Sequence, residues 1–243
     1  MAPQEEMHTV RSFDSELDRL GQTIGRMGGL AESQLASALQ ALSQRDLDLA
    51  SQVVTGDEAV DSVEDNINEQ VVRLLALRQP MGEDLRVIMS SLKIASALER
   101  VADHAASTAH RVEILNKSAP IPAVKTVGRL GALVLSLLKE ALDSYLHRDC
   151  DRALKVWQRD QEVDDLYSSL FRELLTYMME DPRHITPCTH LMFIAKNLER
   201  VGDHATNLAE VTWFVVKGSQ LKSGRPKSDD TYAIGTGSPE ADA

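Results

Sequence analysis

Apolar residues recur at steps of three and four in three successive stretches of the first half of the chain. These stretches span residues 13–42, 60–74 and 87–112. The spacing puts the apolar side chains on one face of a helix, because an α-helix repeats every 3.6 residues. No proline interrupts residues 4–79 or 123–181, as long helices require. The pattern predicts long helices joined by short turns, which makes neighbours antiparallel.

The second half of the chain repeats this pattern at an offset near 100 residues. A shift of 103 residues aligns Asp57 with Asp160, and after a shorter turn the offset becomes 100. Residues 98–105 then match residues 198–205 at seven of eight positions. Helix periodicity alone does not produce identical polar residues, so the repeat indicates a duplication.

The repeat predicts an all-α protein made of two tandem antiparallel three-helix bundles related by internal duplication. The first bundle is expected over residues 1–118 and the second over residues 119–217. Ser, Gly, Pro and charged residues dominate after Lys217, and we expect residues 218–243 to form a disordered tail. The six helices are expected at residues 10–44, 46–78, 83–116, 120–147, 149–180 and 185–217.

Charge and composition narrow the partners and the compartment. A net charge of -11 repels nucleic acid and anionic headgroups, so no nucleic-acid partner is expected. No apolar run approaches the roughly 20 residues that a bilayer requires, although peripheral docking on a membrane protein stays open. The polar start is unlike a signal peptide, and Cys150 and Cys188 fit reduced thiols of a cytosol. We therefore expect a cytoplasmic protein that is not inserted in a membrane.

Carboxylates form repeated pairs that could hold a metal ion. Two acids four residues apart lie on one helix face, one turn apart, and such pairs occur on the second and third helix of each copy. Four carboxylates per copy could converge if these helices pack side by side. Oxygen ligands suit divalent or iron-type ions such as Mg, Mn, Fe or Zn. The candidate metal ligands are Asp57, Asp61, Glu99, Asp103, Asp160, Asp164, Glu199, Asp203 and Asn207.

A solvated acidic face is the alternative interpretation of these pairs. Arg100 and Arg200 each follow an acid and could bridge it, although a surface ion pair contributes little and explains the repetition poorly. His104 and His204 lie about 100 degrees round the helix from the acids, so we expect them at the edge of a site rather than as ligands.

Glycines also recur between the copies, because Gly25 and Gly28 align with Gly128 and Gly131. Each costs a helix about 1 kcal/mol relative to Ala, and a local bend could explain them. The repetition favours close helix packing instead, either within the chain or across a dimer. No nucleophile elbow, Gly-rich phosphate loop or HExxH motif occurs.

These motifs resemble the PhoU family of phosphate-uptake regulators over residues 10–217. The likeness rests on Glu-Arg-x-x-Asp-His-Ala in the third helix and Asp-x-x-x-Asp in the second, each present twice. It implies a cytoplasmic, often dimeric protein that is not an enzyme and that binds metal ions, sometimes iron or zinc clusters, through its acidic motifs. It further implies a negative regulator that links a phosphate ABC transporter to a sensor histidine kinase. Ala102 and Ser107 replace Gly202 and Asn207, so the first site is expected to be weaker or to hold a different number of ions.

Two other functions remain open from the residues alone. A carboxylate metalloenzyme of the bundle type requires an open coordination position and a substrate pocket, which sequence does not reveal. A structural bundle without metal would leave the acids solvated. Neither alternative accounts for both the duplication and the family resemblance.

Overall fold

The computed structural model describes residues 3–221, with side chains from Phe13 onward. Most of the tail expected at residues 218–243 therefore lies outside the described residues. Within them the chain forms helices and no strand. The first half contains α1 (Pro3–Gln44), α2 (Leu47–Thr55), α3 (Asp57–Arg78) and α4 (Gly82–Asn116). The second half contains α5 (Val124–Leu146), α6 (Cys150–Gln158), α7 (Asp160–Glu180), the 3-10 turn η1 (Pro182–His184) and α8 (Ile185–Lys217).

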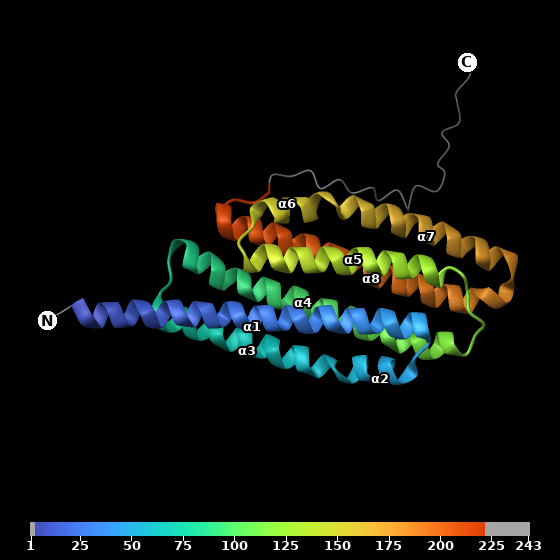
Figure 1. The fold of residues 1–243 in the computed structure, drawn as a ribbon, viewed down its shortest axis with the longest axis horizontal. Coiled ribbons are helices and arrows are strands. Elements are labelled where there is room, and N and C mark those ends of the chain that lie inside the picture. Colours follow the sequence, from blue (N-terminus) through green and yellow to red (C-terminus); the bar gives the residue numbers. More distant parts are fainter. Residues whose placement is uncertain (1–2, 222–243) are drawn as a thin grey trace, which may run out of the picture.

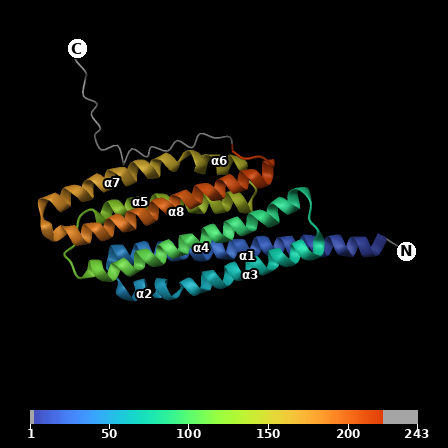
Figure 2. The same cartoon turned by 180° about the vertical axis from the view of Figure 1, so that it is seen from behind.

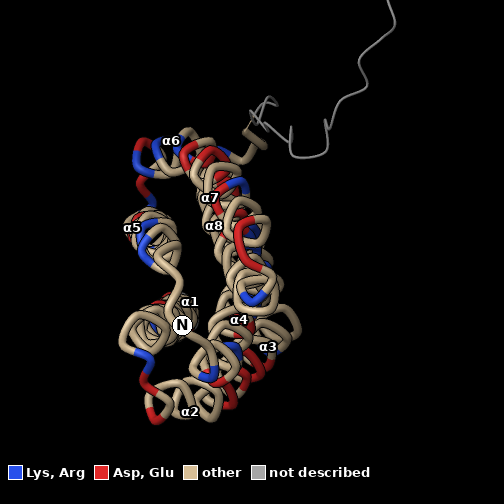
Figure 3. The backbone as a smooth tube through the Cα atoms, turned by 90° about the vertical axis from the view of Figure 1, so that its right-hand side faces the viewer, with Lys and Arg blue, Asp and Glu red and all other residues tan. Residues whose placement is uncertain are grey.

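Two three-helix bundles lie side by side, one from each half of the chain (Figures 1 and 2). In the first bundle α1, α4 and the α2–α3 pair pack together, and in the second α5, α8 and the α6–α7 pair do the same. The bundles meet along two seams, α4 against α8 and α1 against α5. Figure 3 shows this arrangement end-on, with α4 and α8 on one side of the molecule and α1 and α5 on the other. Buried residues of both halves form one continuous core.

The second helix of each copy is broken, which corrects the prediction of single helices over residues 46–78 and 149–180. α2 gives way to α3 at Gly56, and α6 gives way to α7 at Arg159. At each break the hydrogen bonding tightens to a three-residue step, from the Ala59 amide to the Gly56 carbonyl and from the Glu162 amide to the Arg159 carbonyl. The breaks make Asp57 and Asp160 the first residues of α3 and α7, where the helix dipole stabilises negative charge.

The turn after the first helix of each copy has the same geometry in both halves. Arg45 and Arg148 adopt left-handed backbone angles, with φ of 58° and 52°. The next residues, Asp46 and Asp149, cap α2 and α6 by accepting a hydrogen bond from the amide three residues later, an interaction worth about 1 kcal/mol. The duplication therefore extends to individual backbone conformations.

Two glycines pack the bundles against each other along the α1–α5 seam, which confirms close packing within the chain. A Cβ atom on Gly28 would lie 2.7 Å from Leu142 Cδ2, and one on Gly131 would lie 2.5 Å from Leu39 Cδ2. The two contacts are equivalent under the repeat, because a shift of 103 residues aligns Gly28 with Gly131 and Leu39 with Leu142. A Cβ on Gly128 would meet nothing within 4 Å, so only part of the glycine pattern serves packing.

None of the helices in the described residues is both long enough and apolar enough to cross a membrane.

Candidate functional site

Five carboxylates of the first copy gather between α3 and α4, and we call them the first acidic face. They are Asp57, Asp61, Glu64, Glu99 and Asp103. Burial, and then the charges of Asp103 and Asp61, raises the pKa of Asp57. Burial, followed by the charges of Asp103 and Glu64, raises the pKa of Glu99 to about 7. Asp103 thus lies close enough to act on acids of both helices.

Glu64 belongs to the first acidic face although the sequence repeat did not single it out. Its pKa is raised by burial and by Asp61, Asp65 and Asp103. It lies one turn beyond Asp61 on α3. Its counterpart in the second copy is Tyr167, so a search for acids common to both copies passes over it. The helical spacing alone could have identified it.

The second acidic face consists of Asp160, Asp164, Glu199 and Asp203 on α7 and α8. Two of its carboxylates already have a hydrogen-bond donor or a cation from the chain itself. The Asp160 side chain is buried, and the Thr206 hydroxyl donates a 2.9 Å hydrogen bond to its Oδ1. Lys196 Nζ lies 2.9 Å from Glu199 Oε1. Glu199 Oε2 is buried without a hydrogen-bond partner among the described residues, which leaves one acceptor free for a further donor or a cation.

The two faces differ in charge although they share their four paired acids. Ser96 stands in the first copy where Lys196 stands in the second. Burial opposes the charge of Lys196, but its pKa is nevertheless raised by the hydrogen bond to Glu199 and by neighbouring acids. The ammonium also lies 5.4 Å from the ring centre of Tyr167. The second face therefore contains an internal cation, whereas the first has the additional carboxylate of Glu64.

The donors of both faces fit a hard cation by chemistry. Their ligand atoms are carboxylate oxygens, which Mg, Mn and Fe prefer. Burial is the largest cause that raises the pKa of Glu99, and the repulsion by Asp103 and Glu64 that adds to it is the interaction that a cation relieves. Within the described part of the chain no three Asp, Glu, His or Cys side chains converge closely enough to enclose an ion as placed. A cation at either face would therefore require some side-chain rearrangement.

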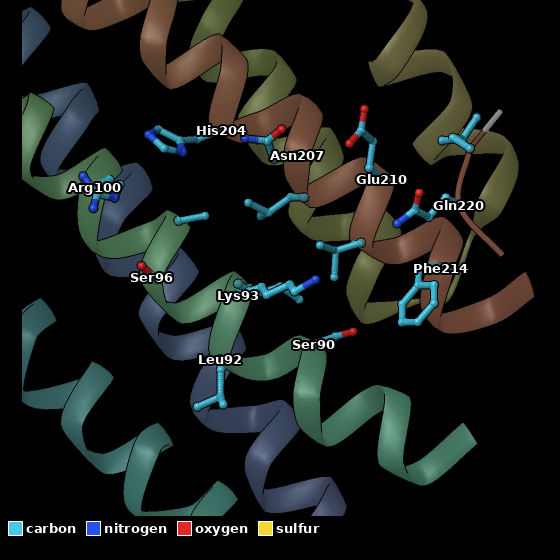
Figure 4. A pocket seen from close by; sticks show the side chains of 15 residues that line it. Ser90, Leu92, Lys93, Ser96, Arg100, His204, Asn207, Glu210, Phe214 and Gln220 are labelled. Carbon is cyan, nitrogen blue, oxygen red and sulfur yellow. The ribbon is translucent and has the colours of Figure 1, made fainter. Parts of the chain in front are cut away.

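Asn207 and the two histidines lie where α4 passes α8. The Asn207 side chain is exposed and lines a groove between these helices (Figure 4). The rings of His104 and His204 stack with centres 5.9 Å apart. Burial, and then the charges of His204 and Arg200, lowers the pKa of His104 to about 4. This keeps the imidazole neutral at pH 7, as suits a ring packed in the seam between the two bundles.

The comparison with protein families matches the chain twice to the PhoU domain, over residues 24–112 and 127–212. Each match covers one of the two structural copies.

Two relatives resemble nearly the whole chain. A protein of Caulobacter vibrioides named "Phosphate-specific transport system accessory protein PhoU homolog" is 50% identical over 223 residues, covering 91% of this chain and 97% of the relative. A Rhizobium meliloti protein of the same name is 47% identical over 230 residues, covering 94% and 97%.

Two crystal structures share the fold. PhoU from Pseudomonas aeruginosa has a TM-score of 0.82 and 41% identity, covering 85% of this chain and all of that one. The phosphate transport system regulatory protein PhoU from Streptococcus pneumoniae has a TM-score of 0.79 and 29% identity, covering 87% and 100%.

Proposed function

Because the chain belongs to the PhoU domain family, we propose that it is a regulatory accessory protein of a phosphate-import system and not an enzyme. The observation that carries this proposal is the match to relatives named as accessory proteins over more than nine tenths of the chain. The match extends over both structural copies, so each bundle of this chain has a counterpart in the relatives.

In this role the protein acts in the cytoplasm as a homodimer and docks on a phosphate ABC transporter. It restrains uptake when phosphate is plentiful, and it signals to a sensor histidine kinase that keeps the starvation response off. Acidic residues along α3 and α7 lie on the side of the molecule that α4 and α8 form (Figure 3). This side offers a charged surface to basic partner segments, and electrostatic complementarity favours fast and specific docking.

We further propose that metal ions bind to the acidic faces. The ligands are drawn from Asp57, Asp61, Glu99 and Asp103 in the first copy and from Asp160, Asp164, Glu199, Asp203 and Asn207 in the second. A bound cation supplies positive charge that offsets carboxylate repulsion and ties α3 to α4 and α7 to α8. Divalent or iron-type ions (Fe, Zn, Mg or Mn) fit these oxygen donors.

Charge reversal tests the docking role. The variant Asp61→Lys/Asp103→Lys should lose binding to the purified transporter in biolayer interferometry, because the acidic surface becomes basic. The matched control Asp14→Lys/Asp18→Lys changes the same charge at exposed positions of α1, on the other side of the molecule, and should bind normally. Equal binding by both variants would contradict a docking role for the acidic surface.

Elemental analysis of tag-free protein tests the metal proposal separately. Stoichiometric metal is expected in the unaltered protein, with less in Glu199→Ala/Asp203→Ala. Absence of metal from both proteins would remove the metal role and leave the regulatory role standing, because docking needs only the charged surface.

A further inference from the structure

A groove of about 720 Å³ lies between α4 and α8. Lys93, Arg100 and Ser90 line it from α4, and Asn207, Glu210 and Phe214 line it from α8 (Figure 4). Its volume falls in the range of pockets that take small molecules, roughly 300–1,000 Å³. The groove is distinct from the contacts between α3 and α4 that form the first acidic face.

The internal duplication supplies a matched comparison, because an equivalent position exists at the other end of the α4–α8 seam. There side chains of the protein itself bridge α4 and α8, beside a smaller pocket of about 370 Å³ that Ser107 and Arg111 line. The Arg111 guanidinium lies 4.4 Å from the ring centre of Phe193, with Nη1 3.4 Å from His190 Nδ1. The Asn197 amide donates a 3.1 Å hydrogen bond to Ser107 Oγ.

None of these closing contacts can form in the open groove, because the residues differ. Val211 replaces Arg111, and Lys93 replaces Phe193. The same shift of 100 residues replaces the other three closing residues by Ser90, Ala97 and Asn207. All five replacements line the open groove. The two halves have thus diverged at the positions whose side chains bridge the helices at one end of the seam and line the groove at the other.

The open groove has two cations on one wall. Lys93 and Arg100 are exposed, and neither forms an ion pair within 4 Å in residues 13–221. Arg100 interacts at longer range with Glu99 and Glu64. Seven residues separate the two cations, which is two helical turns or about 10 Å of axis.

The acid on the opposite wall is already engaged by the protein. Glu210 Oε1 accepts a 3.1 Å hydrogen bond from Trp157 Nε1. The Asn207 amide and the Ser90 hydroxyl remain as neutral groups able to donate to an anion.

From this arrangement we propose that the groove binds a small molecule that carries a chain of phosphate groups. Arg100 grips phosphate oxygens through its planar fork and Lys93 acts as a point charge further along the chain. Asn207 donates from the facing helix, and Phe214 at the far end offers a surface to an attached aromatic body. This binding site does not depend on the accessory role, and Asn207 is the one residue that it shares with the proposed metal ligands.

Isothermal titration calorimetry with ATP and with tripolyphosphate tests the proposal directly. Both titrations use the full chain with EDTA, so that metal at the acidic faces does not contribute. Saturable binding of one equivalent is expected. Tighter binding of ATP would indicate that the nucleoside also contacts the groove, and equal binding would indicate that the phosphate chain alone is recognised. No saturable binding of either probe would overturn the proposal.

Substitutions locate the binding. Lys93→Gln/Arg100→Gln should weaken binding at least about tenfold, because two charge-assisted contacts are lost. Lys139→Gln/Arg200→Gln removes the same charge at two exposed positions outside the groove and should bind like the unaltered protein. Equal weakening by both variants would show a non-specific charge effect and sink the proposed site.

A second variant closes the groove instead of removing its charge. Lys93→Phe/Val211→Arg installs the residues that close the other end of the seam, and should also weaken binding at least about tenfold. Circular dichroism and thermal melting verify that the fold is kept. A folded variant that binds with unchanged affinity would show that the ligand lies elsewhere.

Discussion

Glu99 links the charge of the first acidic face to pH. Its pKa is raised from an ordinary 4.5 to about 7 in the folded chain by burial, Asp103 and Glu64, while Arg100 opposes the shift. The folded state therefore holds more protons than the unfolded state between these values, and its stability falls as pH rises through this window. In EDTA, Glu99→Gln should gain about 1–2 kcal/mol relative to the unaltered protein between pH 4.5 and pH 8.

Urea unfolding of both proteins at several pH values measures this difference. An exposed acid gives the control, since Glu69→Gln should follow the unaltered protein across the range. A Glu99→Gln advantage that does not change with pH would mean that the pKa of Glu99 is the same in the folded and unfolded states, so that neither burial nor repulsion raises it.

Lys196 neutralises part of the second acidic face. Its Nζ lies 2.9 Å from Glu199 Oε1, and the other oxygen of Glu199 is buried without a partner among the described residues. Lys196→Ala should therefore cost about 1–2 kcal/mol of unfolding free energy, because it leaves the Glu199 carboxylate uncompensated. Thermal and urea unfolding measure the loss, and exposed Lys139→Ala should be neutral. A loss no larger than that of the control would show that water screens Glu199 adequately.

Residue-level chemistry could be predicted where it repeats and was missed where the copies differ. The acids Asp57, Asp61, Glu99 and Asp103 each have an exact counterpart in the second copy, and the charge of Asp103 acts on Asp57 and on Glu99. Glu64 could not be found from the repeat, because its counterpart in the second copy is Tyr167. Sequence also does not reveal that the Lys196 ammonium forms an ion pair with Glu199, three residues further along α8, because lysine rotamers depend on the surrounding packing.

At the scale of helices, Gly→Ala substitutions are expected to change stability in opposite directions at the two closely packed glycines and at Gly29, where the position of a Cβ is open. Gly28→Ala or Gly131→Ala would push a Cβ against Leu142 or Leu39. Overpacking of a core costs about 1–3 kcal/mol, offset here by helix propensity and by movement of the leucine. We expect each to be less stable than Gly29→Ala by about 1 kcal/mol or more.

Gly29 is the control because a Cβ there meets nothing within 4 Å. Gly29→Ala should raise stability by up to about 1 kcal/mol through helix propensity. Thermal melts of the three variants decide the order. Equal stabilisation by all three would show that the leucines move aside freely and that the α1–α5 seam does not require glycine.

The positions of long helices follow from apolar periodicity, whereas their interruptions do not. The stripes of buried residues match the predicted faces of α1, α3 and α4. The breaks before α3 and α7 escaped prediction because one occurs at Gly56 and the other at Arg159, so no common residue type marks them. Hydrogen bonds tighten at both places in spite of this difference, which indicates that packing of the bundle imposes the break. The start of α5 at Val124 instead of residue 120 has a local cause, since Pro120 and Pro122 disfavour helical backbone angles at the residues that precede them.

At the scale of the molecule, duplication has produced two faces with the same outline and different charge. The first contains five acids and no lysine, and the second contains four acids with Lys196 beside Glu199. The sequence motif alone suggested that the first site is the weaker one, because Ala102 and Ser107 depart from the pattern. The charges lead to the reverse expectation, since a cation gains more where carboxylates are uncompensated.

Calorimetric titration with Mn²⁺ should therefore resolve two classes of site, the tighter one at the first acidic face. Glu64→Tyr/Ser96→Lys gives that face the residues of the second copy, and it should weaken the tight class about tenfold or more because one carboxylate is lost and an ammonium competes with the ion. The reciprocal variant, Tyr167→Glu/Lys196→Ser, should strengthen the weak class. If both variants instead leave the two affinities unchanged, the internal ammonium does not compete with metal, and the two copies differ for a reason other than cation binding.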